Sequence, residues 1–381
     1  MIDVLIVVPL TPAIAESTGF PLVNSGMLVS AYPIASAVSA FFSAPFSDKL
    51  GRKKMLLIFS IGFCLSSIGC AVSTHSVSIF GFRILSGIFG GPVLSNSLAF
   101  ASDTFRGPIR AKALTTIMLS FSVASIMGVP VGAWIGDHFT WNTAFWAITI
   151  GSVCCIFFIL KMKNIETGAE QGLIGQQYRE MLSLLKISRV RRVFLLQFVM
   201  SIGLFGFVPN IGPWLSVNMG MSSTQIGLVY MQGGVGGFIG NILSGKLLQR
   251  GIMTQLMVVG SIIMGIFLFI TTQEYLPPAY YGVLFAGIMF GGTLRMPALQ
   301  LLFTYLVPIH MRGRLMSTSI IVANITMGMG GVWCIPLLTI EAERVSGMGT
   351  IGIIATLMLA MVPILIFLLK KEIDQVVIDK H

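Results

Sequence analysis

Charged residues are scarce in this sequence: Asp, Glu, Lys and Arg make up 10% of the 381 residues, against 55% hydrophobic residues. A soluble domain of this length needs far more charge to cover its surface. The alternation of apolar and polar residues over about ten positions, which marks the strands of an outer-membrane barrel, is also missing. Together these absences favour one class, an all-α polytopic membrane protein.

Residues that bind metals or carry catalysis are few and dispersed. The four histidines fall in loops and the tail, so no zinc site can be drawn from them. The cysteines lie in apolar runs without CxxC spacing and are predicted to be packing residues: Cys64, Cys70, Cys154, Cys155 and Cys334. No Ser/His or His/Asp/Glu cluster falls within the apolar runs. The sequence therefore predicts no enzyme, no metal site and no cofactor.

Apolar runs of about twenty residues, long enough to cross a hydrocarbon core of roughly 30 Å, recur along almost the whole chain. The predicted spans are residues 1–16, 24–46, 55–73, 77–100, 113–136, 141–161, 193–215, 223–246, 252–272, 278–304, 315–338 and 346–369. The first run is short and has no basic flank, so we expect the natural chain to begin upstream of Met1. A cleaved signal peptide is the alternative, but no charged segment supports it.

Basic residues gather on one side of these spans. All but three of the 24 Lys and Arg residues follow even-numbered spans, and the exceptions are Arg83, Arg295 and Arg344. The opposite connections instead carry acids: Glu16, Asp137, Glu274, Glu341 and Glu343. The positive-inside rule then predicts that both termini are cytoplasmic. The net charge of +10 is explained by the anionic inner leaflet, and we expect no nucleic-acid partner.

The chain divides into two similar halves. The long hydrophilic connection at 162–192 separates an N-terminal unit, 1–161, from a C-terminal unit, 193–381, with six spans each. Phe89-Gly90-Gly91 in span four matches Phe290-Gly291-Gly292 in span ten, and similar basic segments follow both. Such repeats build transporters whose halves rock around a site at the bilayer midplane. The sequence therefore predicts two pseudo-symmetric six-helix bundles.

The connection between spans two and three carries the most specific motif, which runs from Ala44 to Lys54 as APFSDKLGRKK. Gly51 allows a tight turn between antiparallel helices. Asp48 at the end of span two can favour the positive N-terminus of a neighbouring helix. Arg52 can pair with Asp103 at the end of span four. The alternative is a basic loop that only sets topology.

Arg83 lies about seven residues into span four, within Arg83-Ile84-Leu85-Ser86-Gly87. A charge at bilayer depth costs at least about 2.5–3.5 kcal/mol on insertion scales, so it should face a partner or an aqueous cavity. The alternative is an arginine that ties helices together through backbone carbonyls.

Span five holds Gly128, Gly132 and Gly136 on one face, around Pro130. Small residues at this spacing let a facing helix approach closely, and Pro130 removes a backbone donor and bends the helix. The expected facing helix is span eight, through Gly233, Gly236, Gly237 and Gly240. Ordinary small-residue packing is the alternative.

Span one contains Asp3, followed by Pro9, Pro12 and Ile14. Burial favours the protonated form of a carboxyl group, so an acid at this depth can gain and lose protons. The alternative is that Asp3 sits at the membrane edge as a solvated end residue.

These motifs resemble the major facilitator superfamily over nearly the whole chain. Residues 44–54 are similar to its loop signature, with Ala44 in place of the first glycine. Spans one, four and five are similar to motifs of twelve-span drug:proton antiporters, such as Bcr/CflA-like and predicted arabinose-efflux permeases. Span five has the Gly-x-Pro-x-Gly variant of its motif and departs from the commoner adjacent Gly-Pro form.

The resemblance implies a major facilitator fold and secondary transport by alternating access, with efflux of a drug, sugar or metabolite against inward protons. It implies that Asp3 couples protons and that Asp48, Gly51, Arg52 and Asp103 close a cytoplasmic gate. Span eleven is the helix that the resemblance implies as the neighbour of Asp48. Further candidates for a central cavity, beside Arg83, are Asn96, Asn210, Trp214, Tyr230, Gln232, Arg295 and Gln300. We expect a monomer in a bacterial cytoplasmic membrane. A proton symporter or uniporter importing a nutrient is the alternative, and a non-transporting sensor fits less well.

Overall fold

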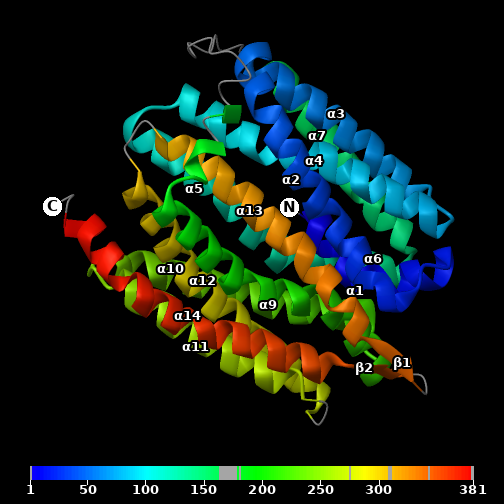
Figure 1. Cartoon of the computed structure of the whole chain (residues 1–381). Coiled ribbons are helices and arrows are strands. Elements are labelled where there is room, and N and C mark those ends of the chain that lie inside the picture. The colour runs from blue at the N-terminus through cyan, green and yellow to red at the C-terminus, as the bar shows by residue number, and fades with distance from the viewer. Residues whose placement is uncertain are drawn as a thin grey trace.

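The structure, a computed structural model, describes residues 2–162, 178–179, 182–273, 276–307, 311–341 and 344–378. Helices dominate these ranges (Figure 1). The N-terminal half contains α1 (Ile2–Thr18), α2 (Ser25–Leu50), α3 (Arg52–Ala71), α4 (Ser76–Thr104), α5 (Gly107–Val123), α6 (Val129–His138) and α7 (Trp141–Lys161). The C-terminal half contains α9 (Ser188–Met219), α10 (Ser223–Leu248), α11 (Met253–Thr271), α12 (Tyr281–Leu306), α13 (Arg312–Trp333) and α14 (Met348–Ile378).

In the described part of the chain, ten segments are long and apolar enough to cross a membrane. The remaining two predicted spans are α1, with 17 residues, and the span made of α5 and α6. The helices differ from the predicted spans mainly at their ends: α9 begins at Ser188 and α14 continues to Ile378. Charged residues at helix ends reach past the apolar core, so hydropathy alone underestimates helix length.

Span five is interrupted where the sequence predicts a bend. A π-helical turn, Ala124–Gly128, joins α5 to α6, and Pro130 is the second residue of α6. Proline has no backbone N–H and cannot continue the regular hydrogen-bond ladder, which explains the irregular turn.

Hydrogen bonds across the connections show which helix ends lie together. Lys53 at the start of α3 donates to the Leu160 carbonyl at the end of α7, 3.0 Å away. At the other end of the same helices, Asn142 donates to the Ala71 carbonyl at 2.7 Å. We name the first end, which carries Lys53, the basic end. The other end, which carries Asn142, is the opposite end.

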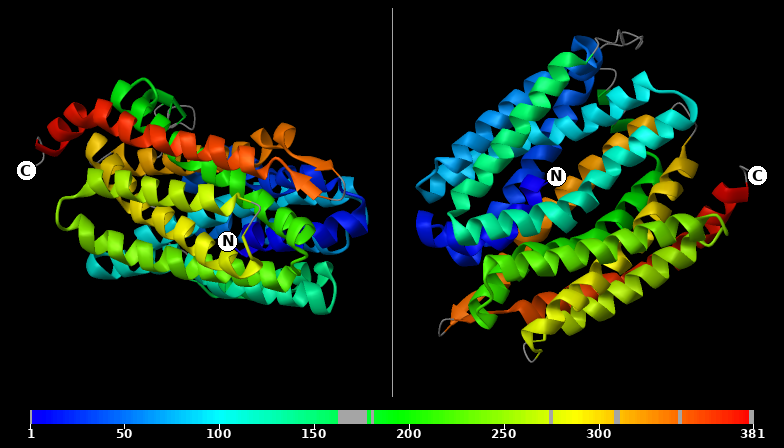
Figure 2. Two further views of the ribbon diagram at one scale, coloured as in Figure 1. Left: turned by 90° about the horizontal axis from the view of Figure 1, so that it is seen from below. Right: turned by 180° about the vertical axis from the view of Figure 1, so that it is seen from behind.

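The two halves lie side by side (Figures 1 and 2). Within the halves, α4 packs on α2 and α3, and α12 packs on α10 and α11. Between the halves, α2 contacts α13, α6 contacts α10 and α1 contacts α9. One buried apolar cluster joins both halves toward the opposite end, including Ile14, Trp141, Trp214 and Met348. A second cluster lies in the C-terminal half and includes Phe303, with Leu184 of the connecting segment packed into it.

Three details differ from the sequence expectations or lie outside them. A short antiparallel pair, β1 (Thr339–Glu341) and β2 (Arg344–Ser346), follows the 3₁₀ turn Ile335–Leu337 after α13. The prediction that all cysteines are packing residues is wrong for Cys154 and Cys155, which are exposed on α7 where lipid can solvate them. Of the 162–192 connection, residues 163–177 and 180–181 lie outside the described part, so the domain boundaries stay a prediction.

Candidate functional site

A buried ion pair joins α1 to α4. Arg83 Nη1 donates to Asp3 Oδ2 at 2.7 Å and to the Asp3 carbonyl at 3.3 Å. The Arg83 side chain is 0% exposed and that of Asp3 is 2% exposed. The alternative placement of Asp3 as a solvated end residue is therefore wrong in this structure. Each charge has found the opposite charge that burial requires.

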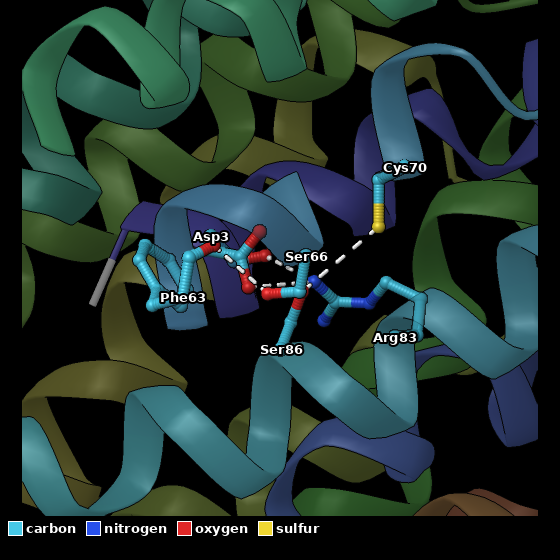
Figure 3. A network of polar contacts seen from close by, with 6 residues as sticks. All are labelled: Asp3, Phe63, Ser66, Cys70, Arg83 and Ser86. Carbon is cyan, nitrogen blue, oxygen red and sulfur yellow. Dashed lines mark hydrogen bonds and ion pairs between the residues drawn. The ribbon is translucent and has the colours of Figure 1, made fainter. Parts of the chain in front are cut away.

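Helix packing positions this pair. The Arg83 guanidinium lies over the ring of Tyr32 on α2, 5.3 Å from its centroid. Ser86, one turn along α4, donates to Ser66 Oγ of α3 at 3.1 Å and approaches Cys70 Sγ at 3.9 Å (Figure 3). Four helices thus surround the two charges with an aromatic face and hydroxyl groups.

The pair is incompletely satisfied. Among the described residues, Asp3 Oδ1 and Arg83 Nε and Nη2 are buried without a hydrogen-bond partner. A buried polar atom without a partner costs about 1–3 kcal/mol, more when it is charged. Such a site gains from a proton, a water molecule or a polar ligand that reaches these atoms.

The predicted gate residues lie at the basic end. Gly51 has φ +89° and forms the turn between α2 and α3, a conformation that favours glycine. Arg52 at the start of α3 pairs with Asp103 near the end of α4: Arg52 Nε lies 3.1 Å from Asp103 Oδ2, and both side chains are partly exposed. The side chain of Asp48 lies outside the described part of the structure, so its predicted contact with span eleven stays a prediction.

The glycines of span five face a different helix from the one expected. A Cβ on Gly132 would collide with Ile6, and one on Gly136 with Leu10, so both glycines face α1. Gly128 ends the π-helical turn. The predicted partners Gly233, Gly236, Gly237 and Gly240 instead face α12. Helical spacing alone identified close-packing faces but could not decide which neighbour each face meets.

α6 nevertheless contacts α10, through other residues. A Cβ on Gly227 of α10 would lie 2.8 Å from Ala133 Cβ and 3.1 Å from Pro130 Cα. Ser125 donates to the Tyr230 carbonyl at 3.3 Å, and Tyr230 donates to the Val208 carbonyl of α9 at 2.9 Å. Pro130 therefore lies in the contact between the two halves.

The other candidate cavity residues divide by exposure. Asn96, Asn210, Trp214 and Tyr230 are buried. Asn96 and Asn210 each donate one turn back along their own helix, to Pro92 and Gly206 respectively. Asn210 Oδ1 and Trp214 Nε1 have no partner in the described ranges. Gln232 and Gln300 are exposed instead, and the Gln232 amide lies against Gly282 of α12.

Arg295 ties helices together. It is fully buried, and Nη1 donates to Ser261 Oγ of α11 at 2.9 Å while Nη2 contacts the Met200 carbonyl of α9 and Met264 Sδ. These partners belong to helices of one half. This geometry matches the structural alternative that the sequence left open for buried arginines better than it matches a cavity residue.

Comparison with known proteins identifies the family. A sequence profile described as the Major Facilitator Superfamily matches residues 1–331. The chain belongs to the major facilitator superfamily. It is 25% identical over 269 residues to the uncharacterized MFS-type transporter YceJ of Bacillus subtilis, covering 69% of this chain and 67% of that protein. It is 25% identical over 258 residues to the chloramphenicol resistance protein of Streptomyces lividans, covering 67% and 65%.

Solved structures of the superfamily share this fold. A nucleoside transporter, NupG, superposes with a TM-score of 0.76 at 12% identity, covering 95% of this chain and 94% of that one. A D-xylose-proton symporter superposes with a TM-score of 0.74 at 15% identity, covering 94% and 93%. Family and fold make this superfamily member a multi-pass membrane transporter of small molecules.

Sequence reasoning found both charges of the central pair but not their contact. Asp3 and Arg83 are 80 positions apart in the sequence, so no local pattern predicts their contact. Two opposite charges at bilayer depth, each needing a partner, were nevertheless a usable signal. Tyr32 was missed because nothing in its local sequence distinguishes it from a packing residue. Ser86 was named only as part of the span-four motif, without a role.

Proposed function

We propose that this superfamily member is a proton-coupled antiporter that exports a small molecule by alternating access. The observation that carries the proposal is the buried Asp3–Arg83 pair with its unsatisfied atoms. We further propose that the basic end is cytoplasmic, with both termini on that side of a bacterial cytoplasmic membrane, and that the protein acts as a monomer.

The pair supplies a chemical switch. A proton on Asp3 would cancel the attraction to Arg83 and release the guanidinium. Its Nε and Nη2 atoms already lack acceptors among the described residues and could then bind a polar ligand. Loss of the proton would restore the pair. Because α1 contacts α9 of the other half, a change at Asp3 reaches the contact between the halves. One proton equilibrium can therefore bias two conformations.

Two observations favour export. Pro130 and the π-helical turn lie where span five meets α10, in the segment that resembles the antiporter motif. One relative is named a chloramphenicol resistance protein, and the multidrug export protein EmrB of Escherichia coli is 26% identical over 164 residues, 43% of this chain and 32% of that protein.

The test is uptake into inside-out vesicles with an imposed pH gradient, acid inside. A growth screen against toxic compounds first selects the compound against which expression protects most, and that compound is then used in labelled form. Asp3→Asn should abolish gradient-driven uptake while leaving exchange of labelled for unlabelled compound. Full gradient-driven uptake by Asp3→Asn would disprove the coupling role.

Glu16→Gln is the matched control, because Glu16 is an acid on the same helix but exposed. It should retain both uptake and exchange. An importing proton symporter is the second candidate, since the same ion pair can couple a proton to either direction. Uptake by inside-out vesicles that requires acid outside would favour the symporter.

A further inference from the structure

At the opposite end, the two halves meet through a carboxylate. Asp137, one residue before the end of α6, accepts hydrogen bonds from the backbone N–H groups of Ser223 at 3.1 Å and Thr224 at 2.6 Å. These are the first two residues of α10. A helix N-terminus carries unpaired N–H groups and partial positive charge, so an acid there is stabilising. A side chain of one half thus binds the end of a helix in the other half.

The helix does not need this acid as a cap. Ser222 Oγ accepts from the Gln225 N–H at 3.3 Å, while Gln225 Oε1 accepts from the Ser222 N–H at 2.9 Å. This capping box belongs entirely to α10. Asp137 binds the two N–H groups that the box leaves unused. The capping box stabilises the start of α10 by itself, and the hydrogen bonds to Asp137 additionally stabilise the contact between the halves.

Elsewhere along the contact between the halves, buried groups favour separation. Ser30 Oγ and Asn210 Oδ1 are buried without a hydrogen-bond partner among the described residues. Both lie near the close approach of Gly26 and Gly331, where α2 meets α13. Water would satisfy both atoms once the helices part. A specific attraction is needed to offset that gain.

We propose that Asp137 is a charge latch that holds α6 and α10 together, so that neutralising it shifts the protein toward the conformation open at the opposite end. This goes beyond proton coupling at Asp3 and does not depend on the direction of transport. Asp137 is a positioning residue, because it acts on the contact between helices and not on the substrate.

The test is the distribution of distances between spin labels in purified full-length protein in lipid nanodiscs. One label pair, on exposed Val77 of α4 and Val283 of α12, reports the opposite end. A second pair, on exposed Thr104 of α4 and Lys246 of α10, reports the basic end. Asp137→Asn should raise the ratio of the open to the closed population about two- to fivefold, since an exposed carboxylate at a helix N-terminus contributes at this level.

Ser223→Pro tests the latch from the other side. It removes one of the two donors at the first helical position, where proline is accepted, so α10 should still fold. In both variants the first distance should lengthen and the second should shorten. Lengthening of both distances would indicate a loosened bundle and overturn the proposal, as would unchanged distances in both variants.

Glu16→Gln is again the control, as an exposed acid at the same end. Unchanged distances in this variant support the latch. A shift as large as that of Asp137→Asn would show a general effect of charge and overturn it. A loss of coupling in Asp3→Asn with unchanged latch behaviour would separate the two proposals.

Discussion

Gly227 of α10 packs directly against Ala133 of α6, where a Cβ would come within 2.8 Å of the alanine Cβ. Neither residue has a polar side chain, yet their close packing brings the two halves into contact one turn from Asp137. The contact depends on a missing side chain and is therefore easy to disturb.

Gly227→Ala should push α6 and α10 apart and favour the conformation open at the opposite end. The added methyl group meets Pro130 Cα at 3.1 Å, a backbone atom that cannot turn aside. The Val77–Val283 spin-label distance measures the effect. Gly245→Ala is the matched control in the same helix, since a Cβ there meets nothing within 4 Å. Equal behaviour of the two variants would contradict the prediction.

Removing either partner of the Asp3–Arg83 pair should destabilise the protein strongly. A buried charge left alone costs about 3–5 kcal/mol, so Arg83→Met and Asp3→Asn should each lower the free energy of unfolding. The double variant leaves no charge unpaired and should cost less than the sum of the two. Chemical unfolding in detergent measures all three, with Lys54→Met as an exposed control. Additive costs would show that the charges do not interact.

Arg295→Met should leave substrate affinity unchanged. All the described partners of Arg295 belong to helices α9 and α11, so its loss affects helix packing first. Methionine has a similar length and carries no charge that must be buried, so the protein should still fold. Binding of the screened compound and thermal unfolding are measured together. A loss of binding with intact folding would contradict this prediction and show that Arg295 is a cavity residue.

The Asp137 latch should weaken in acid. Partial burial alone would raise the pKa of Asp137, but the hydrogen bonds from Thr224 and Ser223 outweigh it and hold the pKa below the ordinary value of 3.8. The stabilisation is therefore complete above pH 3.8 and is lost as the pH falls through the lowered pKa.

The neighbours of Asp137 bring few other charges. His138 follows it on α6 with its ring against Trp134, Glu16 lies on α1, and the first turn of α10 has no charged side chain. The spin-label distance between Val77 and Val283, measured at decreasing pH, tests the prediction. The distance should lengthen as Asp137 is protonated, and Asp137→Asn should remove this pH-dependent change. A pH-dependent change of the same size in that variant would show that another group causes it.

The sequence predicted the helices well because hydropathy and basic loops depend on the bilayer and little on tertiary contacts. The turn at Gly51 and the irregularity at Pro130 also follow from local stereochemistry. The pairing of Asp3 with Arg83 and the facing of Gly132 toward α1 do not, because they depend on how distant helices rotate against each other. Asp137 was predicted only as an acid in a loop, since its partner is a pair of backbone groups.

The small hairpin between α13 and α14 restricts how the C-terminal half can move. Asn218 at the end of α9 donates to the Val345 carbonyl at 2.9 Å and accepts from the Val345 N–H at 2.8 Å. These two bonds fasten the link between the last two spans to α9. Those three helices should move as one rigid unit at the opposite end, which leaves the faces of α9 toward α1 and of α13 toward α2 as the surfaces that slide.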